Sequence, residues 1–441
     1  MQGVVRLHET ALALLEAEAE LDGRWQRGFQ FSLAGPIYAG TNEVQRTGGG
    51  RAPARPAEEV GTLMFFGLSE AARALRDATA GVLSAEVTAA TVRAGWTVRA
   101  GWTVRAGWTM RAGWTMRAGW TGPVGRDSRG GHRGGGGEDP AAGLVRDAWR
   151  KLAAVGALGV LVPEDAGGLG LDETCLVPVL EEAGRSGLPG PIGETTAVAA
   201  PLLAAAPGAR RYLDQVLDGD VTVAAQLDGG PLVPYGQVAD LIVVRAGGSV
   251  RLYERDGLPW EPCATMDGSR GLARLAAARD LPTGMLLTAD PVVIEAAWQR
   301  GVLATAALLN GLSARMLDIT VSYGKQREQF GMPIGSFQAI KHALANALVA
   351  VEFARPAALA AAWAQAHGEP DAAARASMAK VLAADAARLI ARTAIQCHGA
   401  IGYTTEYDLH LFAKRAWALI PSWGTPEWHR TRLAEHLGVQ Q

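Results

Sequence analysis

The chain has 441 residues, enough for roughly two or three domains, each with a sizeable core. Its formal net charge is −2 at pH 7, which gives no electrostatic basis for a nucleic-acid partner. The three cysteines are too scattered for a disulfide framework or a zinc site, and no uninterrupted apolar run reaches the roughly 18 residues of a membrane span, so we expect a cytoplasmic protein with no bound metal and no membrane contact.

Two segments at the start of the chain stand apart from the rest. Residues 1–46 combine an amphipathic helix pattern with the polar string Ile37-Tyr-Ala-Gly-Thr-Asn-Glu-Val-Gln-Arg46. Residues 47–61 are rich in Gly, Arg, Pro and Ala, a composition typical of linkers. Neither segment continues the patterns that follow.

A tandem repeat interrupts the next part of the chain. Residues 92–121 are five copies of the hexapeptide Val/Met-Arg-Ala-Gly-Trp-Thr, and a Gly-rich stretch extends the insertion to residue 139. A six-residue period fits neither a helix nor the usual solenoid repeats, so the insertion 92–139 is predicted to be one loop that exposes its tryptophans. The interleaved Arg and Trp leave single-stranded nucleic acid as an alternative ligand.

Around this insertion the sequence predicts a mainly α fold in three parts. Residues 62–220 have helical spacing, with Ser69 as an N-cap, and residues 221–290 contain short β-type runs bounded by Gly, Pro and Asp. Residues 291–441 are predicted to form a helical bundle, because apolar residues recur at three- and four-residue spacing with few breakers. The expected bundle helices are 292–325, 337–365, 372–397, 406–419 and 427–437.

Two polar, Gly-rich motifs punctuate this bundle. They are Arg327-Glu-Gln-Phe-Gly-Met-Pro-Ile-Gly-Ser-Phe-Gln338 and Gln396-Cys-His-Gly-Ala-Ile-Gly402. An Arg that binds phosphate, an aromatic ring that stacks, and glycines that let backbone N–H groups approach an anion suit a dinucleotide. These residues resemble the C-terminal domain of the flavin-dependent acyl-CoA dehydrogenases, especially the heteromeric actinobacterial-type members.

The resemblance implies a fold with an N-terminal helical domain, a short middle β-domain and a C-terminal bundle. It also implies FAD as cofactor, an acyl-CoA substrate, and a homo- or hetero-oligomer with a related subunit. Arg270, in Asp267-Gly-Ser-Arg270, is expected on the substrate side, with a loop salt bridge as the alternative. The residues implied in cofactor binding are Arg327, Phe330, Gln338, Gln396, Cys397, His398, Gly399, Ala400, Thr425 and Glu427.

The catalytic base of the family is missing from both of its known positions. The reaction needs a carboxylate that removes a proton beside the thioester. In many members it precedes the Gly-Thr of a terminal signature, where this chain has Trp423; the second location falls near Gly301, and Glu295 lies about a turn and a half too early. The string at 37–46 resembles the same signature, with Ala39 before Gly-Thr, and is interpreted as a stray C-terminal fragment of a related chain. No catalytic residue is therefore assigned.

Two functions remain open on this basis. The first is an FAD-dependent acyl-CoA dehydrogenase that makes an α,β-double bond in fatty-acid or sterol side-chain catabolism. The second is a non-catalytic structural partner subunit of a heteromeric acyl-CoA dehydrogenase. Trp423, the shortened β region and Ala400, which replaces the second glycine of the usual pair, favour the second.

Overall fold

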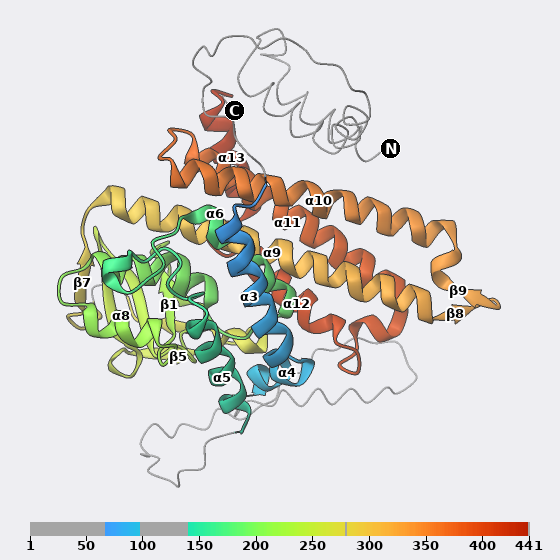
Figure 1. Cartoon of the computed structure of the whole chain (residues 1–441), viewed down its shortest axis with the longest axis horizontal. Helices are drawn as coiled ribbons and strands as arrows, with labels where there is room; N and C mark the ends of the chain where they lie inside the picture. The colour runs from blue at the N-terminus through green and yellow to red at the C-terminus, as the bar shows by residue number, and fades with distance from the viewer. Residues whose placement is uncertain (1–66, 98–139, 278–279, 440–441) are drawn as a thin grey trace.

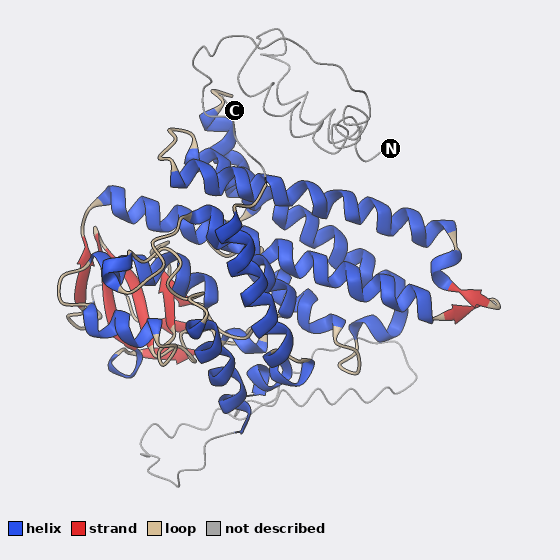
Figure 2. Cartoon of the chain, viewed as in Figure 1, coloured by secondary structure: helices blue, strands red, loops and turns tan. Residues whose placement is uncertain are grey.

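The computed structural model describes residues 67–97, 140–277 and 280–439 (Figure 1). The predicted N-terminal fragment and linker (residues 1–61), and the hexapeptide copies at 98–121, lie outside the described residues. The described part is mostly helical, with a group of strands in the middle of the chain and a short hairpin within residues 328–333 (Figure 2). The predicted mainly α fold is therefore confirmed.

The N-terminal part consists of short helices, one of which is a π-helix. Ser69 begins the first helix as predicted, since its hydroxyl accepts from the backbone N–H of Ala72 at 3.1 Å. The elements are α3 (Glu70–Glu86), α4 (Ala89–Thr97), α5 (Pro140–Ala154), the 3-10 helix η1 (Glu164–Ala166), α6 (Glu173–Ser186), the π-helix η2 (Glu194–Ala199), α7 (Ala200–Ala205) and α8 (Arg210–Leu217).

The loop prediction for the repeat insertion is wrong at its start. The first hexapeptide copy, residues 92–97, forms the second half of α4, and its Val92 is only 3% exposed. The six-residue period did not indicate this helix. The helix begins at Ala89, before the repeat, and a single copy of the repeat extends it by about one and a half turns.

The strands form two small sheets between the helical parts. One sheet has the order β1-β3-β4-β7, with β1 parallel to β3 and the other pairs antiparallel, and the second has the order β2-β6-β5. Tyr235 and Ile242 belong to the apolar cluster of this part. The strands are β1 (Val223–Gln226), β2 (Leu232–Val233), β3 (Leu241–Ala246), β4 (Ser249–Glu254), β5 (Trp260–Pro262), β6 (Ala273–Leu275) and β7 (Met285–Thr288), with 3-10 turns η3 (Arg255–Gly257) and η4 (Gly268–Arg270).

The C-terminal bundle is built on the 36-residue helix α9 (Pro291–Gln326). Asp290 caps this helix by accepting from the N–H of Val292 at 2.8 Å, and Pro291 fits the first helical position. A hairpin of β8 (Glu328–Gln329) and β9 (Met332–Pro333) follows at the far end of the molecule (Figure 1). The remaining elements are η6 (Ile334–Ser336), α10 (Gln338–Ala366), α11 (Ala372–His398), η7 (Gly399–Tyr403), α12 (Leu409–Leu419) and α13 (Pro426–His436).

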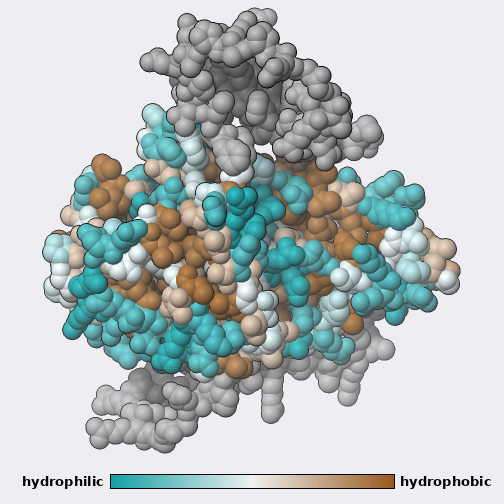
Figure 3. Space-filling view, viewed as in Figure 1, coloured by the Kyte–Doolittle hydropathy of each residue, from teal (hydrophilic) through white to brown (hydrophobic). Residues whose placement is uncertain are grey.

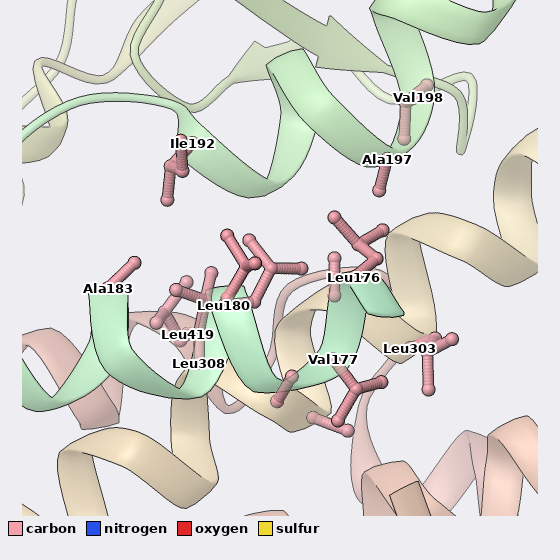
Figure 4. Close-up of a cluster of buried hydrophobic side chains, with 14 of the residues drawn as sticks. Leu176, Val177, Leu180, Ala183, Ile192, Ala197, Val198, Leu303, Leu308 and Leu419 are labelled. Atoms are coloured by element: carbon pink, nitrogen blue, oxygen red, sulfur yellow. The ribbon is translucent and has the colours of Figure 1, made fainter. Parts of the chain in front are cut away.

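The main core lies where α6, the π-helix η2 and α9 meet. Figure 4 shows Leu176 and Leu180 of α6 facing Ile192 and the η2 segment, with α9 side chains on the other flank. Gly184 permits this contact, because a Cβ there would lie 3.0 Å from the carbonyl carbon of Leu308. The N-terminal helices and the bundle therefore share one core.

Two bundle helices, α9 and α10, are long and apolar enough to cross a membrane by length and composition alone. The apolar window of α9 is 61% buried, which is the property of a core helix, whereas that of α10 is 39% buried. Leu348 on α10 is 43% exposed, and Figure 3 shows apolar residues reaching the surface on the bundle side. The outer face of α10 is mixed, because Leu348 is exposed there together with Lys341, His342, Glu352 and Arg355.

Candidate functional site

The loop between α12 and α13 carries Trp423 at the position expected for a catalytic base. Trp423 is 9% exposed and has a φ of 56°, in the left-handed region that side chains rarely adopt. Its indole lies directly on α9 at Gly301: a Cβ at Gly301 would come within 2.5 Å of Cζ3 of the ring. The two positions that lack a base in the sequence therefore face each other, and one indole occupies the space between them.

A second indole packs on this one, and a third packs on the second. The Trp298 ring, one turn before Gly301 on α9, lies 5.2 Å from that of Trp423, and the Trp428 ring lies 6.1 Å from Trp298. Glu295 is one turn further from Gly301, is half exposed, and pairs with Arg432 at 3.5 Å. No carboxylate from α9 reaches the Trp423 ring among these contacts.

A buried lysine binds the backbone of the Trp423 loop. The Nζ atom of Lys380, on α11, donates to the carbonyl oxygens of Ile420 at 2.6 Å and Gly424 at 3.2 Å. Its side chain is fully buried, and burial together with the cations Arg388 and Arg270 lowers the pKa of Lys380 to about 7. Because Ile420 ends α12, the ammonium also neutralises the negative end of that helix.

A buried histidine binds the carbonyl of Trp423 itself. Nε2 of His429 is 2.9 Å from the Trp423 oxygen, and Nδ1 is 3.0 Å from the Ser377 hydroxyl. A carbonyl only accepts, so Nε2 carries the proton and Nδ1 accepts from Ser377 in the neutral ring. Burial lowers the pKa of His429 to about 4. Lys380 and His429 together hold the loop in its left-handed conformation.

Arg270 completes this clamp from the middle of the chain. Its guanidinium donates to the carbonyl of Ala418 at 2.5 Å and to the Ser422 hydroxyl at 3.0 Å, and it lies 5.3 Å from the Tyr235 ring. Burial raises the pKa of Tyr235 to about 12. Arg270, predicted on the substrate side, is 5% exposed and points into the Trp423 loop.

The sequence reasoning missed one carboxylate at this site, Glu194. It begins the π-helix η2, a kind of distortion often found at functional sites, and is only 4% exposed. Burial raises its pKa, against the opposing effects of Arg270 and of a hydrogen bond with the Trp423 side chain. A lone Glu before the apolar run Thr-Thr-Ala-Val-Ala-Ala is the signal that could have found it.

The depressed pKa of His429 predicts a loss of stability in acid. In the unfolded chain His429 is protonated below about pH 6.5, whereas in the folded protein it is protonated only below about pH 4. Because the unfolded state binds the extra proton between these values, the free energy of unfolding falls by about 3 kcal/mol as the pH drops from 6.5 to 4. We expect His429→Gln to flatten the decline in urea denaturation between pH 6.5 and 4. His410, whose burial also lowers its pKa to about 4, and Glu194 titrate in both proteins, so the difference isolates His429. Parallel pH profiles for the two proteins would contradict the assignment.

The first predicted cofactor group lies on the protruding hairpin. Arg327 ends α9 with its side chain exposed, and Phe330 at the hairpin tip is 92% exposed with a φ of 55°. Gly335 packs the following turn closely on α9, since a Cβ there would lie 2.9 Å from the Gly324 oxygen. Gln338, also exposed, begins α10. Beside the hairpin a hollow of about 440 Å³ is lined in part by Lys325 and Lys341.

The second predicted group ends α11 at the same end of the bundle. His398 is buried and stacks on Tyr323 of α9, with ring centroids 4.2 Å apart, and Tyr323 lies one turn before Arg327. Gln396, Cys397 and Ala400 are at least partly exposed around it. Gly399 has a φ of 64° and open space where a Cβ would be, so its backbone can approach a ligand. The two groups are therefore neighbours.

The third predicted group lies far from the other two. Thr425 caps α13 by accepting from the Trp428 N–H at 3.2 Å, and exposed Glu427 pairs with Arg388 at 3.4 Å. Gly301, which touches the Trp423 loop, precedes Arg327 by 26 positions along one straight helix, or about 39 Å at ~1.5 Å per residue. The nucleotide-type residues and the Trp423 loop thus stand at opposite ends of the bundle.

The predicted cofactor residues at the hairpin end leave polar groups and backbone open to solvent. Exposed Arg327, Phe330 and Gln396, together with open backbone at Gly399, suit a nucleotide and its phosphates. Toward the other end, the indole of Trp423 fills the space against Gly301. The predicted nucleotide residues are therefore exposed at one end of the bundle, and the two predicted base positions are packed against each other toward the other end.

Comparison with known proteins agrees with this geometry. The family models for the N-terminal and C-terminal domains of acyl-CoA dehydrogenases match residues 138–220 and 292–438. The chain belongs to the acyl-CoA dehydrogenase family. It is 37% identical over 275 residues to the acyl-CoA dehydrogenase IpdE2 of Mycobacterium tuberculosis, covering 62% of this chain and 81% of that protein.

Solved structures of two-component members share the fold. The ChsE4–ChsE5 complex of Mycobacterium tuberculosis superposes with a TM-score of 0.65 at 24% identity, covering 86% of this chain and all of that one. A variant of the Tcur3481–Tcur3483 steroid acyl-CoA dehydrogenase gives a TM-score of 0.64 at 25% identity, covering 84% and 98%. The actinobacterial-type resemblance predicted from the sequence is confirmed.

Proposed function

We propose that this chain is the base-lacking subunit of a two-component acyl-CoA dehydrogenase. Its partner subunit supplies the proton-abstracting carboxylate, and the pair introduces an α,β-double bond into a CoA thioester with a bulky, steroid-like or lipid acyl group. The observation that carries the proposal is the Trp423 indole packed on Gly301, which fills both positions from which the family base acts.

The chemistry explains why this observation supports the proposal. The reaction removes a proton from the α-carbon of the thioester, while a bound flavin accepts the hydride from the β-carbon on the opposite face. An indole cannot accept the proton. Lys380, His429 and Arg270 also hold the backbone and Ser422 of the Trp423 loop by hydrogen bonds.

The placement of the nucleotide-type residues supports assembly with a partner. Arg327 and Phe330 project from the end of the bundle, about 39 Å along α9 from Gly301. A dinucleotide gripped by these residues would extend its ring toward another chain rather than toward the Trp423 loop. The exposed face of α10, where Leu348 lies among polar and charged side chains, is the surface that we expect such an assembly to cover. The Tcur3481–Tcur3483 relative carries a two-component, steroid name.

A second candidate function is catalysis by the chain itself, and Glu194 is the observation that favours it. This buried carboxylate has a raised pKa and lies beside the Trp423 side chain, as a base in a closed site would. In that case the α-proton would pass to Glu194 after displacement of the indole. Glu194→Gln would then abolish turnover, whereas it would leave turnover intact in a complex whose partner holds the base.

Purification with and without a partner tests the proposal. The chain expressed alone is expected to carry little flavin absorbance and no acyl-CoA dehydrogenase turnover, and co-expression with a related chain that has a carboxylate before its Gly-Thr should restore both. A yellow homo-oligomer that oxidises an acyl-CoA would overturn the proposal in favour of the second candidate.

Arg327→Ala provides a matched test of the nucleotide contacts. Because the side chain is exposed, we expect the melting temperature of the lone chain to stay unchanged while the flavin content of the complex falls by about tenfold, the effect of losing one strong phosphate contact of 1–2 kcal/mol. Arg210→Ala, an exposed arginine on α8, is the control and should alter neither quantity. Equal flavin content in both variants would contradict the assignment of Arg327.

A further inference from the structure

The first hexapeptide copy is docked in a specific groove. Val92 enters the core at 3% exposure, and Arg93 pairs with Asp408 at 2.5 Å. Gly95 lies so close to the loop before η2 that a Cβ there would be 2.6 Å from Cβ of Pro189. The surface beneath α4 therefore contacts four positions of the copy: the apolar residue, the arginine, the glycine and the tryptophan.

The tryptophan of this copy makes the most contacts. The Trp96 ring meets His410 edge to face at 5.5 Å, and the ammonium of Lys414 lies 5.2 Å from its centroid. Gly268 lies beneath the ring, because a Cβ there would be 3.2 Å from it. We call the surface formed by Pro189, Gly268, Asp408, His410 and Lys414 the hexapeptide groove.

Residues 98–121 repeat the docked sequence four more times. Each copy has arginine, glycine and tryptophan in the same order and spacing, and either valine or methionine in place of Val92. We propose that the hexapeptide groove is a recognition site for this hexapeptide, and that the copies within the chain are interchangeable occupants of it. The segment can therefore shift through the groove in steps of six residues.

The connections allow such shifts. If the second copy occupies the groove in place of the first, the connection from α3 to the groove becomes six residues longer. The entropic cost of closing a loop rises only slightly with such an increase in length. With the last copy docked, the 18 residues from 122 to 139 still separate it from α5, a reach of up to ~60 Å. Every copy is also preceded by a threonine, as Val92 is preceded by Thr91.

Local hydrogen bonds make the first copy the preferred occupant. Thr88 and Thr91 each accept from the other's backbone N–H at 3.3 Å, and the Thr91 hydroxyl donates to the Glu86 carbonyl at 2.8 Å. A shifted copy would lose the bonds that join Thr91 to α3. The shift should therefore become visible when the first copy is disabled.

Hydrogen exchange on the full chain tests the proposal. In the wild-type protein, backbone amides of 92–97 should exchange slowly. In a Gly95→Val, Trp96→Ala double variant, the slow exchange should move to residues 98–103, and the melting temperature should fall only slightly. The same double substitution in a chain lacking 98–121 leaves no second copy, so it should lower the melting temperature much further.

Two controls make each outcome informative. Gly107→Val with Trp108→Ala disables the third copy and should leave protection at 92–97 and the melting temperature unchanged. Deletion of 98–121 alone should also retain protection at 92–97. The proposal is overturned if slow exchange does not reach 98–103 in the first variant, or if the double substitution destabilises the five-copy and single-copy chains equally.

Discussion

Replacement of Arg415 by methionine is expected to lower the free energy of unfolding by about 3–5 kcal/mol, the usual result of leaving one member of a buried ion pair alone. Arg415, on α12, pairs through Nε with the Asp267 carboxylate, which is completely buried. Its guanidinium also donates to the carbonyl of Leu188 at 2.7 Å and to the Ser269 hydroxyl. Burial lowers the pKa of Arg415, but Asp267 and Tyr235 raise it overall, so the guanidinium stays charged.

The size of this effect follows from what Arg415 joins. Leu188 lies between α6 and η2, Asp267 caps η4, and Arg415 belongs to the bundle, so a single side chain connects the three parts of the fold. Urea denaturation measures the change. Arg388→Ala, which removes an arginine from an exposed pair with Glu427, is the matched control and should cost below about 1 kcal/mol.

A second substitution separates the charge from the packing. Asp267→Asn in the Arg415→Met background removes the unpaired buried carboxylate and should recover part of the lost stability, because the Asn oxygen still accepts from the Ser269 N–H. If the single Arg415→Met variant were as stable as the Arg388→Ala control, the three parts would not depend on this pair.

The bundle was the most predictable part of the structure. Gly and Pro residues in 333–335, 368–370 and 399 interrupt otherwise Ala- and Leu-rich sequence, and the predicted helix limits fall within about three residues of α9 to α13. Local chemistry decides these limits, which is also why Ser69 was identified as an N-cap. Strands β2, β5 and β6 have two or three residues each, too few for any periodic pattern.

The features missed at the site depend on contacts between distant residues. The substrate-side role of Arg270 stays a prediction, whereas its contact with Ala418, 148 positions later, was missed because nothing in the local sequence points to it. The six-residue period of the hexapeptide predicted a loop. In the structure, Gly95 packs so closely on Pro189, in another segment, that a side chain at position 95 would clash with it. In the sequence, Trp423 and Gly301 each indicated that a base is missing. Only the structure shows that the Trp423 ring fills the space beside Gly301.

Trp423→Gly is expected to open a cavity where the family places its base. Loss of a buried tryptophan typically lowers the free energy of unfolding by about 3–5 kcal/mol. Relief of the left-handed backbone at 423, where glycine is comfortable, should return about 1 kcal/mol. The cavity would be lined by the face of Gly301, the ring of Trp298 and the carboxyl of Glu194. Added indole should refill it and raise the melting temperature of this variant.

The complementary variant shows whether the indole and Gly301 truly share one space. Gly301→Leu alone should be strongly destabilising, because its side chain would enter the Trp423 ring, but in the Trp423→Gly background it should fill the cavity and abolish the indole response. Trp428→Gly, which removes a 42% exposed ring, is the control and should show no indole response. If indole raised the melting temperature of all three variants, or of none, Trp423 would not occupy a closed pocket. The packing of Trp423 on Gly301 would then not explain why a base is missing.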